Sequence, residues 1–272
     1  MTPAPPKPVR FADLGLRLAS GLALAALALA DLWLGGWWLA ALAAVAAAVM
    51  LWELHRMATG DGRLAAPALL VMAGAAVIGV AATAGLGVAA GALAILAGAA
   101  AAAALSPRPA RPWVAGGVIY IGLAMCFVSM LRDDVARGFP VIAWLVLVVV
   151  AADVGAYFVG RSLGGPRLWR AVSPGKTWSG AIGGLGLAVA VGIGVGHMQG
   201  WPLARTGALS AALAVASQAG DLLESAVKRR FGVKDASQLI PGHGGVMDRL
   251  DGVMGALWFL ALYDFATGGV GA

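Results

Sequence analysis

The stretch best suited to chemistry lies near the end of the chain and reads QAGDLLESAVKRRFGVKDASQLIPGHGGVMDRLD. Asp221, Glu224 and Ser225 are three and four residues apart, so they lie on one face of a helix. Asp248 and Asp251 are again three apart, at the start of the next expected helix. Carboxylates crowded at a helix C-terminus repel one another and the helix dipole, so this pattern requires a cation.

Two kinds of cation could hold these carboxylates together. Lys228 follows Glu224 by four residues and could neutralise it directly. A hard metal ion is the sharper alternative, because two acidic pairs on facing helix ends offer a cage of oxygen ligands. On this second interpretation the ion is Mg²⁺, with room for a second cation, and the ligands are Asp221, Glu224, Asp248 and Asp251.

Basic residues and a glycine-rich turn lie between the two acidic pairs. Mg²⁺ usually takes one or two carboxylates plus phosphate oxygens, while Lys and Arg neutralise the remaining phosphate charge. The stretch therefore predicts a polyphosphate site. His243, in the turn, is a metal ligand, a proton donor or a turn residue, and contact with a leaving phosphate is the favoured role. The basic residues are Lys228, Arg229, Arg230, Lys234 and Arg249.

A second segment, SPGKTWSG over 173–180, offers hydroxyls, a cation and the amides of a helix start. Helix N-termini favour anions and lysine supplies a point charge, so Ser173, Lys176 and Thr177 are candidates for binding phosphate. The segment lacks the GxxxxGK[ST] spacing and is not expected to follow a strand. An ordinary helix cap is the alternative interpretation.

A third constellation lies near the end of the sixth expected span, where Asp153 and Tyr157 are four residues apart in an apolar run. An ionisable group inside a span implies a pathway, a partner or a site. Substrate binding and a structural pairing of Asp153 with a nearby cation are equally consistent with the sequence.

The composition indicates what must position these residues. The chain of 272 residues is 61% hydrophobic and 12% charged, with a mean hydropathy of +0.87, whereas soluble domains carry roughly 25% charged residues. We therefore expect an all-α polytopic membrane protein, whose 40 glycines allow close helix packing. The single cysteine excludes a disulfide framework and a cysteine metal site.

Hydropathy predicts nine transmembrane helices after a short tail over 1–13. With the N-terminus in the cytoplasm and the C-terminus outside, 16 of the 19 Lys and Arg residues fall on the cytoplasmic side. The exceptions are Arg132, Arg137 and Arg205. The expected spans are 14–34, 37–55, 64–82, 86–105, 113–131, 140–160, 179–199, 204–226 and 251–268.

We interpret the net charge of +6 as a determinant of orientation in the membrane and not as a sign of nucleic-acid binding. Most polar clusters follow residue 150, while the first half is nearly all apolar. We divide the chain into an N-terminal region of about five spans, 1–135, and a catalytic region of about four spans, 136–272.

The sequence strongly resembles the phosphatidate cytidylyltransferase family, also called CDP-diacylglycerol synthases. The family signature is a serine, then Lys-Arg, Lys-Asp, His-Gly-Gly and Asp-Arg-x-Asp, and it is met without a gap from Ser225 to Asp251. The segments 153–160 and 173–177 also look like family motifs, and the resemblance covers roughly 140–265. Two positions depart from it, since Ser179 stands where Glu is common and Gly252 where Ser is common.

The resemblance implies Mg²⁺-dependent transfer of CMP from CTP to phosphatidic acid in phospholipid biosynthesis, with pyrophosphate leaving. It implies that Asp221, Asp248 and Asp251 hold metal and that Asp153 lies near the membrane-facing wall of the site. The partners would be CTP, phosphatidic acid and membrane lipid, on the cytoplasmic side of the inner membrane, and a homodimer is compatible with this. The residues expected to contact phosphates are Lys176, Lys228, Arg229, Lys234 and Arg249.

Three other functions are open to the same residues. A cation-coupled transporter would explain the intramembrane Asp153 and Asp221, and it would work without CTP. A CDP-alcohol phosphatidyltransferase also arranges aspartates around Mg²⁺, but the Asp-Gly-x-x-Ala-Arg opening of that family is absent. A non-catalytic scaffold would tolerate loss of Asp248, whereas an enzyme would lose turnover in Asp248→Asn and keep its fold.

Overall fold

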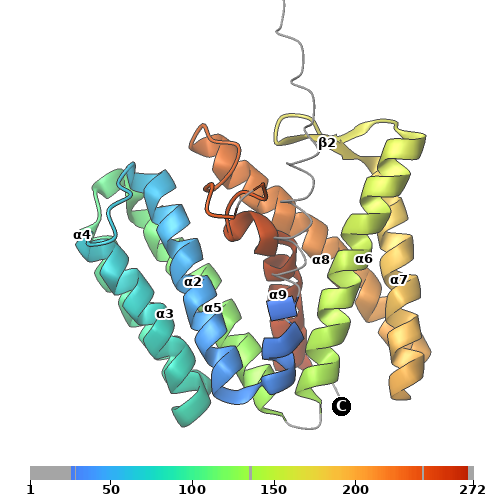
Figure 1. Ribbon diagram of the computed structural model, residues 1–272, viewed down its shortest axis with the longest axis horizontal. Coiled ribbons are helices and arrows are strands. Elements are labelled where there is room, and N and C mark those ends of the chain that lie inside the picture. Colours follow the sequence, from blue (N-terminus) through green and yellow to red (C-terminus); the bar gives the residue numbers. More distant parts are fainter. Residues whose placement is uncertain (1–25, 28, 135–136, 241, 269–272) are drawn as a thin grey trace, which may run out of the picture.

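The computed structural model describes residues 26, 27, 29–134, 137–240 and 242–268, and most of them are helical (Figure 1). The expected tail 1–13 and most of the first expected span, 14–34, lie outside the described residues. Within that span, residues 29–34 are helical. The described helices are α2 Gly36–Thr59, α3 Pro67–Leu86, α4 Val88–Leu105, α5 Arg111–Asp133, α6 Gly138–Leu163, α7 Trp178–Gln199, α8 Leu203–Arg230 and α9 Met247–Thr267, with a 3₁₀ turn at Arg108–Ala110.

Seven helices in the described part of the chain are long and apolar enough to cross a bilayer. They are α2 to α7 and α9, with the 3₁₀ turn continuous with α5. The all-α polytopic membrane fold is therefore confirmed. Helix α8 is longer than any of them, at 28 residues, but it carries more polar side chains. The count of nine spans and the orientation of the termini stay predictions.

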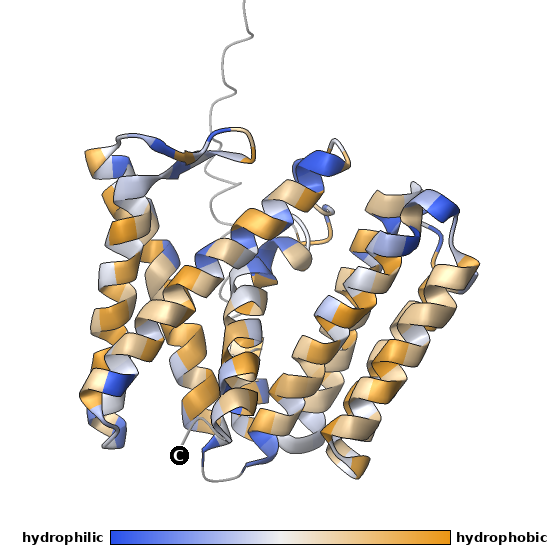
Figure 2. Ribbon diagram, turned by 180° about the vertical axis from the view of Figure 1, so that it is seen from behind, coloured by the Kyte–Doolittle hydropathy of each residue, from blue (hydrophilic) through white to orange (hydrophobic). Residues whose placement is uncertain are grey.

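Successive helices alternate in direction, so the connections after α2, α4, α6 and α8 all lie at one end of the bundle (Figure 1). We call this the polar end, because the hydrophilic residues of these connections gather there (Figure 2). Helices α2 to α5 lie on one side and α6 and α7 on the other, with α8 and α9 between them (Figure 1). Trp258 of α9 reaches the first group, donating from Nε1 to the Tyr120 carbonyl of α5 at 3.0 Å.

The segment after α6 is extended rather than helical. Strands β1 (Arg167–Trp169) and β2 (Ser173–Thr177) form an antiparallel hairpin with Arg167 opposite Thr177 and Trp169 opposite Ser173. The expectation that 173–180 does not follow a strand was therefore wrong, because β1 precedes the segment and pairs with its first residues. The helix cap in that segment is confirmed, because the Thr177 hydroxyl accepts from the Gly180 amide at 3.1 Å and α7 begins at Trp178.

Glycines allow α6 and α7 to pack backbone against backbone. A Cβ atom on Gly184 would lie 2.5 Å from the carbonyl oxygen of Ala152, and Gly155 faces the same contact from α6. The predicted role of glycine in tight helix packing is confirmed here. This contact fixes α6, which carries Asp153 and Tyr157, against the start of α7.

We predict opposite effects for two alanine substitutions in α7. Gly184→Ala should lower the unfolding free energy in detergent by about 1–3 kcal/mol, because the methyl group has no space. Gly186→Ala, whose Cβ would meet nothing within 4 Å, should be neutral or stabilising by up to about 1 kcal/mol. Thermal unfolding of the two purified variants checks this, and equal midpoints would contradict the close contact.

Candidate active site at the polar end

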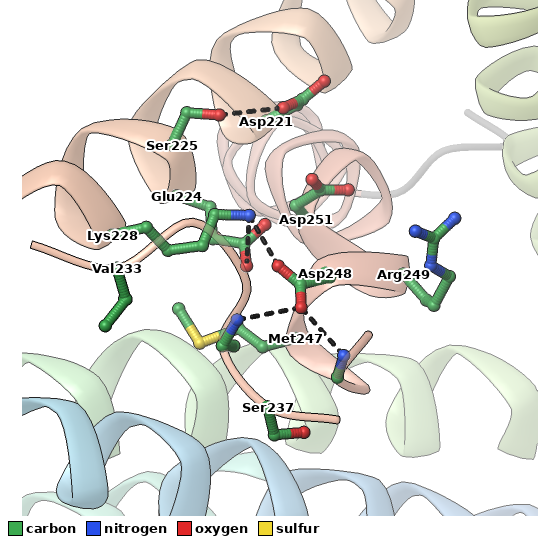
Figure 3. A network of polar contacts seen from close by, with 12 residues as sticks. Asp221, Glu224, Ser225, Lys228, Val233, Ser237, Met247, Asp248, Arg249 and Asp251 are labelled. Atoms are coloured by element: carbon green, nitrogen blue, oxygen red, sulfur yellow. Dashed lines mark hydrogen bonds and ion pairs between the residues drawn. The ribbon is translucent and has the colours of Figure 1, made fainter. Parts of the chain in front are cut away.

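Lys228, near the end of α8, lies between two carboxylates (Figure 3). Its Nζ atom is 2.6 Å from Oδ1 of Asp248 and 3.3 Å from Oε1 of Glu224. The three side chains are only 11%, 6% and 5% exposed, respectively. The first alternative from the sequence, that Lys228 is the cation between the acids, therefore describes this structure.

Asp248 also holds the connection between α8 and α9, residues 231–246. Its Oδ2 atom accepts from the amide of Ala236 at 2.9 Å and from the amide of Gly245 at 2.8 Å (Figure 3). With Lys228 on Oδ1, both oxygens of Asp248 have partners. Binding of a metal by Asp248 would require one of these donors to give way.

Glu224 and Asp251 are neighbouring carboxylates, and the one ion pair that either forms among the described residues is the 3.3 Å contact of Glu224 with Lys228. Both oxygens of Glu224 are buried and accept no hydrogen bond, and the carboxylate of Asp251 is its neighbour. Asp251 itself accepts from the Gly252 amide at 2.7 Å. A buried carboxylate beside a half-buried one needs a shared proton or a further cation, so the chemistry of Glu224 and Asp251 fits a divalent ion.

Asp221 lies about one turn before Glu224 on α8, and its side chain points toward the β1–β2 hairpin. Its Oδ2 atom is 2.5 Å from Nζ of Lys176 in β2, and its Oδ1 accepts from the Ser225 hydroxyl at 3.4 Å. The four predicted metal ligands are thus divided between different partners. Within the described ranges, no three Asp, Glu, His or Cys side chains form a group that could hold a metal ion by themselves. The metal roles stay predictions.

A cavity of about 560 Å³ lies between α6, the hairpin, the start of α7 and α8. This volume is in the range of small-molecule sites. The cavity brings the second and third constellations of the sequence together with the start of the first, at Gln218 and Asp221. Asp153 forms no ion pair among the described residues. Polar residues that line it are Asp153, Tyr157, Arg161, Arg167, Lys176, Thr177, Gln218 and Asp221.

A second, apolar cavity of about 300 Å³ lies on the other side of α8, against α2, α5 and α9. Its walls include Leu54, Trp113 and Met254, and its acidic border is formed by Glu224 and Asp251. Helix α8 therefore separates a polar cavity, which Asp221 faces, from an apolar cavity, which Glu224 faces.

The remaining predicted site residues lie on the surface of the polar end. Arg229 donates from Nε to the Val172 carbonyl at 3.4 Å, and from Nη1 to the Val233 carbonyl at 3.0 Å. It thereby links the hairpin to the 231–246 connection. Arg249 donates from Nε to the carbonyl of His243 at 2.9 Å, and Lys234 is exposed. These residues line neither cavity. Ser173 is half-buried in β2.

Sequence reasoning missed Glu53 and Arg56 of α2. Glu53 is fully buried and accepts hydrogen bonds from the start of α9, while Arg56 donates to the Ala236 carbonyl at 2.8 Å. The rule that singled out Asp153, an ionisable residue in an apolar run, also applies to Glu53. The nearly apolar first half of the chain therefore contributes directly to the polar end.

We predict strong coupling between Lys228 and Asp248. Lys228→Met should destabilise the protein more than Asp248→Asn, because it leaves two buried carboxylates unpaired, whereas Glu224 still pairs with Lys228 in the second variant. The double variant should recover about 0.5–3 kcal/mol relative to the sum of the two. Denaturation in mixed micelles measures this, and strict additivity would contradict a direct ion pair.

The chain is similar in sequence to several proteins of one name. A phosphatidate cytidylyltransferase of Brucella suis biovar 1 (strain 1330) is 45% identical over 173 residues, which are 62% of this chain and 63% of that protein. The chain thus spans less than two thirds of the length of this relative. Proteins of the same name from Haemophilus influenzae and Bacillus subtilis are 44% identical over 138 residues (48% of both chains) and 39% identical over 147 residues (52% of this chain, 55% of the relative).

The family model for cytidylyltransferases matches residues 15–266, which include every helix from α2 to α8 and nearly all of α9. The match therefore extends beyond residues 140–265, which carry the motifs described above. Because it covers almost the whole sequence, the chain belongs to the cytidylyltransferase family.

Proposed function

We propose that this protein transfers CMP from CTP to phosphatidic acid, producing CDP-diacylglycerol and pyrophosphate. The observation that carries the proposal is the pair of cavities on either side of α8, one polar and one apolar, with carboxylates and Lys228 between them. Such an arrangement suits a reaction between a water-soluble nucleotide and a lipid. The names of the relatives support the same reaction, and nothing among them favours a transporter.

The polar cavity is the proposed nucleotide site. Lys176, Arg161 and Arg167 line it and can neutralise phosphate oxygens. Lys176 is paired with Asp221, so an arriving phosphate would compete with that carboxylate for the ammonium group. Exchange of partners would release Asp221 at the moment when a triphosphate binds.

The apolar cavity is the proposed position of an acyl chain of the lipid. Its lining is mostly apolar, and its polar border carries acids that would repel a bare phosphate. A divalent ion held by Glu224 and Asp251, with Asp221 once Lys176 has left it, would remove this repulsion. Mg²⁺ bound there would supply charge neutralisation to both phosphates. The lipid phosphate is already an anionic nucleophile, so no general base is obligatory and positioning supplies most of the catalysis.

We place the polar end on the cytoplasmic side of the inner membrane. The connections at that end carry most of the Lys and Arg residues, as positive-inside topology requires, and CTP is a cytosolic nucleotide. Arg132 lies in the last turn of α5, Arg137 precedes α6 and Arg205 lies in the first turn of α8, all at the opposite end of the bundle. A homodimer stays a prediction.

Purified protein in detergent, given phosphatidic acid, CTP and Mg²⁺, should release pyrophosphate and form lipid-linked CMP. EDTA should abolish both products and added Mg²⁺ should restore them. Absence of product from folded protein, across several lipids and nucleotides, would overturn the proposal. Cation flux into proteoliposomes without CTP would then favour the transporter.

Lys176→Met should raise the KM for CTP roughly 10- to 100-fold, the effect expected for loss of one charge-assisted hydrogen bond. The matched control is Arg108→Met, which removes an exposed cation at the same end, outside both cavities. Initial rates over a range of CTP concentrations measure the difference. Equal KM values in the two variants would remove Lys176 from the nucleotide site.

A further inference from the structure

Glu53 is a fully buried carboxylate in the half of α2 nearer the polar end, and the hydrogen bonds to its side chain come from residues distant in sequence. Its Oε1 atom accepts from the Ser237 hydroxyl at 2.5 Å and from the Val246 amide at 3.0 Å. Its Oε2 atom accepts from the Met247 amide at 2.7 Å. The three donors belong to the 231–246 connection and to the first residue of α9.

These donors explain why a carboxylate is tolerated there. The first amides of a helix have no acceptor within the helix and carry its positive dipole end, so they stabilise an anion. Glu53 in turn satisfies two of the amides at the start of α9. The fit is close at Gly245, because a Cβ atom at that position would collide with Oε1 of Glu53 and with the Ser237 hydroxyl.

Glu53 and Asp248 hold the same connection from opposite sides. Asp248 takes the amides of Ala236 and Gly245, while Glu53 takes the neighbouring Ser237 hydroxyl and Val246 amide. Arg56, one turn after Glu53, adds a hydrogen bond to the Ala236 carbonyl. The start of α9 is thus fixed by α2, which lines neither the polar cavity nor the Lys228 contact.

We infer that Glu53 is a positioning residue for the candidate active site. By binding the amides of Val246 and Met247, it sets the residue at which α9 begins. That in turn sets the direction in which Asp248 and Asp251 point toward Lys228 and Glu224. Glu53 acts through these residues and contacts no substrate in this assignment.

The kinetic part of the test rests on the proposed function. Glu53→Gln should lower kcat for CMP transfer at least tenfold and change the KM for CTP less than about threefold, because Lys176 and the polar cavity are untouched. Ser237→Ala removes one donor and leaves two, so its loss of kcat should be smaller. If Glu53→Gln does not fold, Ser237→Ala tests the same expectation, a lower kcat with a KM for CTP that is nearly unchanged.

The matched control is Ser210→Ala, which removes a buried hydrogen bond from Trp144 Nε1, 3.0 Å long, between α6 and α8. It should lower thermal stability without lowering kcat. If Ser210→Ala and Glu53→Gln are equally stable and lose kcat equally, the effect of Glu53 on kcat is explained by stability alone. That result would contradict the positioning role. An unchanged kcat in folded Glu53→Gln would overturn the inference.

Hydrogen exchange separates this inference from the proposed function. Glu53→Gln should accelerate amide exchange in peptides covering 236–248 and leave peptides of α6 unchanged. If the wild-type protein transfers no CMP, the proposed function fails, while faster exchange confined to 236–248 would still support the contact. Unchanged exchange in 236–248 would overturn the positioning role whatever the activity.

Discussion

The ammonium group of Lys228 lies between Glu224 and Asp248, and the arrangement of the polar end follows from that contact. A charged group within a bundle of apolar helices has no bulk water around it, so it must find opposite charge within the protein. Asp248 meets this need on one oxygen and holds two backbone amides on the other. One ion pair thereby joins α8, the 231–246 connection and α9, and it leaves Glu224 and Asp251 side by side with an excess of negative charge.

Helix α8 has two faces with different chemistry at this depth. Asp221 faces the hairpin and Lys176, while Glu224, three residues later, faces the apolar cavity beside Tyr120 and Asp251. Three residues along a helix correspond to less than a full turn, so the two carboxylates are close along the axis but open to different spaces. A single helix can therefore present acids to two ligands that enter from separate sides.

Much of this structure could be predicted from the sequence, because the bilayer imposes simple rules. Apolar runs of about 20 residues predict the helices of the described part of the chain, α2 to α9, to within a few residues. The rule for intramembrane charge led to Asp153, which lines the polar cavity together with Lys176 and Thr177. The strands β1 and β2 were missed because they are short and depend on pairing across a turn rather than on local periodicity.

The sequence places Asp248 at the start of α9, in agreement with its observed start at Met247, but it could not show what holds that start in place. The amides of Val246 and Met247 are satisfied by Glu53, which is almost 200 positions away, and Asp248 accepts from the amide of Gly245 just before the helix. The pairing of each lysine with a particular carboxylate could not be predicted either, because it depends on contacts between distant segments. Spacing alone places Asp221, Glu224 and Lys228 on one face, but it cannot show that Lys176 takes Asp221 while Lys228 takes Asp248.

The distance in sequence between Glu53 and Met247, 194 positions, has a consequence for how the protein is made. Helix α2 is synthesised and inserted long before α9 leaves the ribosome. During that interval the Glu53 carboxylate lacks the donors that it has in the finished protein, and in apolar surroundings it must stay protonated or remain near water. The polar end is therefore completed only by the last described helix. A chain that stops short of α9 carries a recognisable defect, an unpaired acid at membrane depth.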